Sequence, residues 1–392
     1  MFLQHNNCLL HPHANRHAIL VLPKYAKGCP WVCQTIGPNP RVETANSLAL
    51  GRGQPHEALH DAYVPLTRPP TPWTETIRPR ISVIIPTFNR LTKLKNALAS
   101  LRRQTCPPDS FDIIVVDDGS TDETLKWLRK AAGELGSLHV LSQKHAGPAA
   151  ARNLATSEAR GEILLFMGDD VIASERLLEI HLKTYETMGP NIAVQGGVRL
   201  ASSVPMTRFV RYLDKRSAAQ FQLGNARPGD VLPFFSFYTC NCSVPRELVE
   251  ACGGFPQDVV YYDDTFLGWM LERKGIPIIY EPLAEVQHDH AQTLDEFLLR
   301  QRQAGKDAAI LAARHSELRK PLRVDQAALF EGNVWEIAKK VVKMLLFNRW
   351  TVRILKKMSE SRVLPFTVSS IIFSGLIGYE HRAAARRQKP RA

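Results

Sequence analysis

The chain has 392 residues, of which 44% are hydrophobic, and a formal net charge of +12. This length and apolar content suffice for one large domain or two ordinary ones, and they exclude collagen-like and wholly disordered chains. Most of the positive charge lies at the end, because residues 337–392 hold 13 basic and two acidic residues. A nucleic-acid partner would require basic residues over the whole body, so we expect none; the basic tail predicts peripheral contact with an anionic membrane.

The seven cysteines are scattered and odd in number, which is typical of a reducing compartment rather than of a disulfide framework. The N-terminus lacks the basic start and long apolar run of a secretory signal, so we expect no export. With the basic tail, these features predict a cytoplasmic protein on the inner face of the cytoplasmic membrane. Residues 1–79 show no sustained helical or strand period and predict a poorly ordered N-terminal extension.

From residue 81 onward, short apolar runs alternate with helical patterns. This alternation predicts an α/β fold with a mixed, mostly parallel sheet flanked by helices. The expected strands are 81–86, 111–116, 138–142 and 163–167, and the expected helices are 90–103, 121–132 and 148–159. After residue 197 the alternation breaks, and we expect a loop-rich half with a short helix from 246, a helix over 264–274, short strands near 278 and 286, and a helix over 294–313.

Polar side chains follow three of the predicted strands, where an open parallel sheet binds its ligands. They are Thr87 and Asn89, then Asp117 and Asp118, then Asp169 and Asp170. No strand leads into a GxGxxG turn or a phosphate-binding lysine motif, which argues against an ordinary dinucleotide site. Four neighbouring aspartates would repel one another unless a cation compensated them, and oxygen ligands favour Mg²⁺ or Mn²⁺. A divalent cation of this kind also suits a nucleoside diphosphate.

Six motifs occur in a fixed order: IIPTFNR, VVDDGSTDET, AGPAAARN, GEILLFMGDD, NCSVPRELVEACGGF and YYDDTFLGWMLERKG. Together they resemble the nucleotide-sugar and acceptor elements of glycosyltransferase family 2, whose members have the GT-A fold. The resemblance implies a catalytic domain over 80–313, with a nucleotide-sugar half (80–197) and an acceptor half (198–313). Residues 314–392 are then a helical C-terminal extension, a basic amphipathic tail.

The resemblance also assigns residues to the donor site. Nucleotide-sugar binding is expected at Pro86, Thr87, Asn89, Asp117, Asp118, Arg152 and Asp169. For Asp118 the alternative is a turn cap, and for Arg152 it is an ion pair with Asp117. Gly168 stands where the family often has the first aspartate of its DXD motif, and this puts strict metal dependence in doubt.

Metal binding is expected at Asp170, directly, and at Asp169 and His288; a surface position is the alternative for the histidine. The Asp263–Asp264 pair resembles the family's Glu-Asp motif, which implies that Asp264 is the general base and that Asp263 raises its pKa. The alternative is that both acids only favour a helix N-terminus. Asn241 and Trp269 are expected in the acceptor or sugar pocket, with core packing as the alternative for Trp269.

The predicted function is that of an inverting glycosyltransferase using a nucleoside-diphosphate sugar, most simply a UDP-sugar, and a glycan or lipid-linked acceptor in cell-surface polysaccharide or glycolipid synthesis. The alternative is a catalytically impaired nucleotide-sugar- or carbohydrate-binding protein, which Gly168 favours. In the tail, none of the 17 residues over 363–379 is charged. We expect a helix lying in the membrane interface there, with spanning the bilayer and packing on the catalytic domain as the alternatives.

Overall fold

The computed structural model describes residues 64–65, 79–134, 137–215, 223, 225–324, 333, 342 and 345–388, all within one compact unit. Most of the extension predicted over 1–79 lies outside the described residues, as does part of the tail predicted over 314–392. The two-residue strand β1 (Val64–Pro65) is described within that extension, and it pairs with the edge of the sheet.

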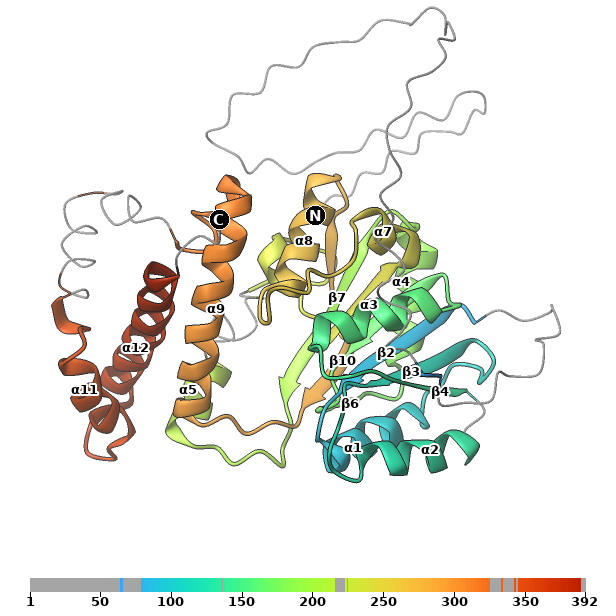
Figure 1. Cartoon of the computed structure of the whole chain (residues 1–392), viewed down its shortest axis with the longest axis horizontal. Helices are drawn as coiled ribbons and strands as arrows, with labels where there is room; N and C mark the ends of the chain where they lie inside the picture. Colours follow the sequence, from blue (N-terminus) through green and yellow to red (C-terminus); the bar gives the residue numbers. More distant parts are fainter. Residues whose placement is uncertain are drawn as a thin grey trace, which may run out of the picture. The chain divides into compact units, whose positions relative to one another are not determined.

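The ten described strands form one mixed sheet, which is flanked by helices (Figure 1). Its first half is parallel, in the order β4-β3-β2-β5. The bounds are β2 (Ile81–Thr87), β3 (Phe111–Asp117), β4 (Leu138–Ser142) and β5 (Ile163–Met167). Because parallel strands end at one edge, the residues after β2, β3 and β5 meet there.

The second half of the sheet is joined to the first by an antiparallel strand, β9 (Asn241–Pro245), between β5 and β7. Beyond it, β7 and β10 run parallel, while β6 and β8 are antiparallel to β10. The bounds are β6 (Val171–Ala173), β7 (Ala193–Leu200), β8 (Val231–Leu232) and β10 (Ile278–His288). The two short strands expected near 278 and 286 are therefore one strand, with an irregularity between Glu281 and Glu285.

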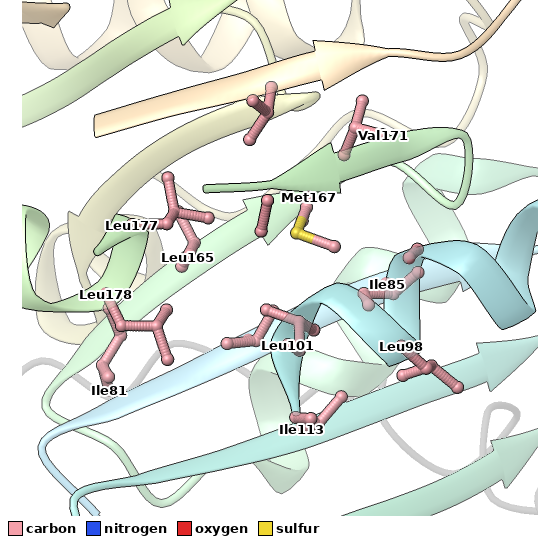
Figure 2. Packing of buried hydrophobic residues seen from close by; sticks show 14 of the residues in the cluster. Ile81, Ile85, Leu98, Leu101, Ile113, Leu165, Met167, Val171, Leu177 and Leu178 are labelled. Carbon is pink, nitrogen blue, oxygen red and sulfur yellow. The ribbon is translucent and has the colours of Figure 1, made fainter. Parts of the chain in front are cut away.

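Helices cover both faces of the sheet because successive side chains of a strand point to opposite faces and both faces of the central strands are apolar. On β2, Ile81 and Ile85 face one core, shown in Figure 2, and Ile84 faces the other. The first core is covered by α1 (Leu91–Leu101), α2 (Thr124–Glu134) and α4 (Leu177–Met188), and the second by α3 (Pro148–Glu158), α7 (Arg246–Ala251) and α8 (Asp263–Arg273). The predicted fold class is confirmed.

A separate helical layer contains the C-terminal region. It consists of α5 (Arg208–Lys215), α9 (Leu294–Arg314), α11 (Thr351–Glu360) and α12 (Phe366–Arg387), with the 3₁₀ turns η2 (Phe234–Ser236) and η3 (Ser316–Leu318) nearby. A capping box at Thr293 and Glu296 begins α9. Figure 1 shows α9 and α12 side by side.

The apolar segment expected in the membrane interface is α12, and its buried face packs on protein. Phe373 and Leu376 are at most 1% exposed, in a cluster with Phe209 of α5 and Phe297 of α9. The structure thus has the arrangement that was the alternative, packing on the catalytic domain. Among the described helices, none has the length and apolarity required to cross a bilayer.

Candidate active site

A cleft of about 970 Å³ opens at the edge of the sheet where β2, β3 and β5 end. The strand-end residues Pro86, Thr87, Asp118, Asp169 and Asp170 line it. Asp263 and Asp264, at the start of α8, line the same cleft, as does Arg152 of α3. The sheet thus brings together residues that are as much as 178 positions apart in the sequence.

The acidic pair Asp169–Asp170 occupies the turn between β5 and β6. Thr87 donates a hydrogen bond of 2.8 Å from its Oγ1 to Asp169, and Arg90 Nη1 lies 3.0 Å from Asp169 and 2.9 Å from Asp170. A Cβ added at Gly168 would lie 3.0 Å from Asp170 Oδ1, so glycine leaves the space that this carboxylate occupies. Arg90 thus supplies positive charge to both carboxylates.

The two carboxyl groups differ in acidity. Burial raises the pKa of Asp169 to about 6, and Asp170 adds to that rise while Arg90 opposes it. Burial acts in the same direction on Asp170, but its neighbours His288, Arg90 and His290 outweigh burial and hold its pKa below the ordinary value. Asp170 is therefore the more anionic of the pair and the better cation ligand.

Two histidines approach Asp170 from the end of β10, because β10 pairs with β6 and sets His288 opposite Val171. The distance from His288 Nε2 to Asp170 Oδ1 is 3.7 Å, and that from His290 Nδ1 to Asp170 Oδ2 is 3.8 Å. Both imidazoles have a lowered pKa, chiefly because they are buried. His288 is thus in the cleft and not on the surface.

The side chains around Asp170 suit a metal ion that is shared with a nucleotide. Within the described part of the chain, no three histidine, cysteine or acidic side chains are grouped as a metal site. Mg²⁺ and Mn²⁺ bound to a nucleotide need fewer protein ligands, because the phosphates and water supply the rest. The carboxylate of Asp170 and the imidazole of His288 have the donor atoms for such a shared ion.

The second acidic pair begins α8. Arg152 Nη1 donates to Asp263 Oδ2 at 2.5 Å, so the arginine pairs with Asp263 and not with Asp117. Asp264 accepts a 2.7 Å hydrogen bond from the backbone N–H of Thr265. Burial, with a further contribution from the neighbouring Asp263, raises the pKa of Asp264 to about 7. A carboxylate of this basicity can accept a proton near neutral pH.

Several residues expected at the nucleotide hold the surrounding loops. Asp118 lines the cleft, but its carboxylate accepts hydrogen bonds from the backbone N–H groups of Ala146 and Gly147, as the turn-cap alternative proposed. Asn89 and Asp117 do not line the cleft. The Asn89 side chain accepts from the N–H of Thr121, and Asp117 accepts from that of Ser120.

Neither residue expected in the acceptor pocket lines the cleft. Asn241 is completely buried in the sheet, where its amide donates to the carbonyls of Gly197 and Ala284. Trp269 is 5% exposed and packs against Phe266 and His315 on the inner side of α8. Both residues lie outside the cleft lining, because the position of a residue in a motif does not determine whether its side chain contacts the pocket or supports it.

Comparison with known proteins gives the family. A model of Glycosyl transferase family 2 matches residues 82–240, which contain the strand-end acids and Arg152. Residues 82–240 thus form a glycosyltransferase family 2 domain. The chain is 30% identical over 283 residues to the pre-mycofactocin glycosyltransferase of Mycobacterium tuberculosis, covering 69% of this chain and 55% of that one. It is 29% identical over 238 residues to the validoxylamine A glucosyltransferase of Streptomyces hygroscopicus subsp. limoneus, covering 53% and 51%.

The chain thus spans about half the length of these curated relatives. Among solved structures, a mannosyltransferase from Pyrobaculum calidifontis, in complex with GDP-Man and Mn²⁺, superposes with a TM-score of 0.54 at 21% identity. The superposition covers 80% of this chain and 89% of that one. This likeness establishes the fold of the family 2 domain as GT-A.

The sequence reasoning missed the wall of the cleft that lies beyond the matched residues. Residues from α9 and α12 line it, among them Arg300, His381 and Arg382. His381 Nε2 is 3.1 Å from the hydroxyl of Tyr262, which directly precedes the acidic pair of α8. The basic composition of the tail was the one sequence feature that pointed to these residues. Only the packing of α12 on α9 brings the basic side chains of α12 to the cleft.

Proposed function

We propose that this family 2 glycosyltransferase transfers a sugar from a nucleoside-diphosphate sugar to an acceptor hydroxyl, with inversion at the anomeric carbon. The observation that carries the proposal is that Asp170 and Asp264 line one cleft from different elements. One carboxylate belongs to the strand-end group suited to a cation and a diphosphate, and the other has the basicity of a general base.

In this proposal the strand ends bind the donor. Thr87, Asp118 and Asp169 face the nucleotide, for which a UDP-sugar is the simplest candidate. Arg152 forms the ion pair that keeps Asp263 oriented beside the base. Asp170 and His288 would hold a divalent cation, which when bound supplies positive charge to the departing diphosphate.

The proton chemistry belongs to Asp264. Its carboxylate takes the proton of the acceptor hydroxyl as that oxygen attacks the anomeric carbon from the face opposite the nucleotide. Direct attack with a single base requires no covalent sugar–protein intermediate and gives inversion. The cleft wall of α8 and α12 is where the acceptor would bind.

The donor step is tested by a thermal-shift screen of UDP, GDP and dTDP with and without Mn²⁺, because a ligand of the folded state raises the melting temperature. We expect one diphosphate to stabilise the protein, more strongly with Mn²⁺. Hydrolysis of the matching nucleotide sugars then measures turnover. Nucleotide binding without turnover on any sugar would favour the impaired binding protein, and no binding at all would contradict the proposal.

A membrane role is proposed for α11 and its flanks rather than for α12. Trp350 is 72% exposed and Ile354 63%, beside the basic residues Arg353 and Lys357. Exposed apolar and cationic side chains on one helix suit the surface of an anionic bilayer. This would support an acceptor in cell-surface polysaccharide or glycolipid synthesis. Sedimentation with phosphatidylglycerol vesicles tests it: Ile354→Asp should reduce binding, and equal binding of both proteins would contradict it.

A further inference from the structure

The cleft has two walls of opposite charge. Arg90 and Arg152, on the sheet side, are each paired with aspartates of that wall. On the other wall stand Arg300 of α9, Arg323 after η3 and Arg382 of α12. In the part of the chain that the structure describes, no carboxylate pairs with these three arginines.

Two of the three arginines, Arg323 and Arg382, line the same wall of the cleft, and their positive charges repel each other. Burial lowers the pKa of Arg382, and the charges of Arg386 and Arg323 lower it further. Two guanidinium groups held together without a counter-charge are destabilising by themselves, and an anion between them would relieve the repulsion. Guanidinium groups bind phosphate and carboxylate oxygens in a two-pronged geometry.

The helix that carries Arg382 is fixed in place. Arg302 of α9 forms two hydrogen bonds with Glu380, of 2.5 and 3.0 Å. The backbones of the two helices touch at Gly305, where an added Cβ would lie 2.1 Å from the carbonyl oxygen of His381. Arg382 is therefore presented to the cleft by a rigid element, so little ordering is needed when a ligand binds.

The wall that holds the arginine pair contacts the residue that precedes the acidic pair of α8. His381, adjacent to Arg382, is hydrogen-bonded to Tyr262, and Tyr262 directly precedes Asp263 and Asp264. Arg323 also acts on Tyr262, whose pKa its charge lowers against a larger rise due to burial. A group bound by these arginines would therefore occupy the cleft that Tyr262 and Asp264 also line.

We propose that Arg323 and Arg382 form a subsite for an anionic acceptor, one that carries a phosphate or carboxylate group near the hydroxyl to be glycosylated. The inference rests on the proposed function and adds the chemical class of the acceptor. A neutral glycan would leave both guanidinium groups without a counter-charge, whereas an anionic acceptor pairs with them and is oriented by them.

The test uses the full chain saturated with UDP and Mn²⁺, so that the donor diphosphate site is filled. Glycerol 3-phosphate and glycerol, and glucuronate and glucose, are titrated as matched charged and neutral probes and followed by saturation-transfer NMR. We expect at least one charged probe to bind, more weakly as NaCl is added, and its neutral partner not to bind. Arg382→Gln and Arg323→Gln should each weaken that binding about tenfold.

Arg387→Gln is the matched control, because this exposed arginine is on the same helix but does not line the cleft. It should bind the charged probe as the wild type does. Equal binding of charged and neutral probes, or equal weakening by all three substitutions, would overturn the subsite. A loss of UDP affinity in Arg382→Gln, with charged-probe binding unchanged, would assign the arginines to the donor instead. Failure of the proposed function is measured separately, as absence of both UDP binding and nucleotide-sugar hydrolysis.

Discussion

The two walls of the cleft are built in different ways. The sheet wall consists of residues that follow successive strands, and its arginines are neutralised by neighbouring aspartates. The helical wall is assembled from α9, α12 and the turn after η3, and its arginines have no acidic partner within the described residues. The sheet wall, whose arginines are paired with its own aspartates, can be recognised from local motifs. The unpaired arginines of the helical wall indicate instead the charge of the ligand that would neutralise them.

The difference extends to how each wall is held. The sheet wall stands on two apolar cores that belong to the family 2 domain. The helical wall stands on a third core shared by α5, α9 and α12, and Arg208 of α5 donates to the carbonyl of Leu364 at 2.6 Å. Damage to the tail should therefore affect the acceptor side of the cleft first.

The largest expected effect comes from the base at the junction of the walls. Asp264→Asn removes the proton acceptor and should lower kcat by about 10²- to 10⁴-fold. The affinity for UDP, measured by calorimetry, should remain unchanged because the strand-end residues are intact. Asp214→Asn, at an exposed position of α5, is the control. Normal turnover of Asp264→Asn would show that Asp264 is not the general base.

The next largest effect tests whether the packing of α12 contributes to the stability of the protein. Phe373 is completely buried between α12 and its neighbours, so Phe373→Ala should lower the free energy of unfolding by about 3–5 kcal/mol. Ile371→Ala, two residues away and 65% exposed, should change it by less than about 0.5 kcal/mol. Urea unfolding followed by circular dichroism measures both. Equal stability of the two variants would mean that α12 does not depend on this core.

A smaller effect separates the roles of two cations at Asp169 and Asp170, the guanidinium group of Arg90 and a divalent metal ion. If Arg90 and a divalent ion compete for Asp169 and Asp170, Arg90→Gln should raise Mn²⁺ affinity about tenfold in the absence of nucleotide. Free Mn²⁺ measured by electron paramagnetic resonance gives the affinity directly. Arg176→Gln, which breaks an exposed ion pair with Glu179, is the control. A weaker affinity in Arg90→Gln would show that the guanidinium supports the ion rather than replacing it.

The contrast between the walls also explains what the sequence could predict. The apolar strands and the acids that follow them are local patterns, so the fold class, the family and the meeting of Asp170 with Asp264 followed from the sequence. Arg90 could not be assigned because its aspartate partners are distant in the sequence, and Arg382 could not because only the packing of α12 on α9 brings it to the cleft. Asn241 and Trp269 were misassigned because a motif gives the position of a residue but not the direction of its side chain.

The smallest expected effect is the pH dependence of turnover. The pKa of Asp264 is raised to about 7, so the base is protonated below that pH and kcat should fall as the pH is lowered, by about twofold from pH 8 to 7 and more steeply below. The same shift means that the folded chain binds this proton more tightly than the unfolded chain, so this group makes folding less favourable as the pH rises from about 4 to 7. Asp263→Asn removes a neighbouring negative charge and frees Arg152, and both changes lower the pKa of Asp264. The midpoint of the kcat profile should therefore move to lower pH in Asp263→Asn, and an unchanged midpoint would mean that another group controls it.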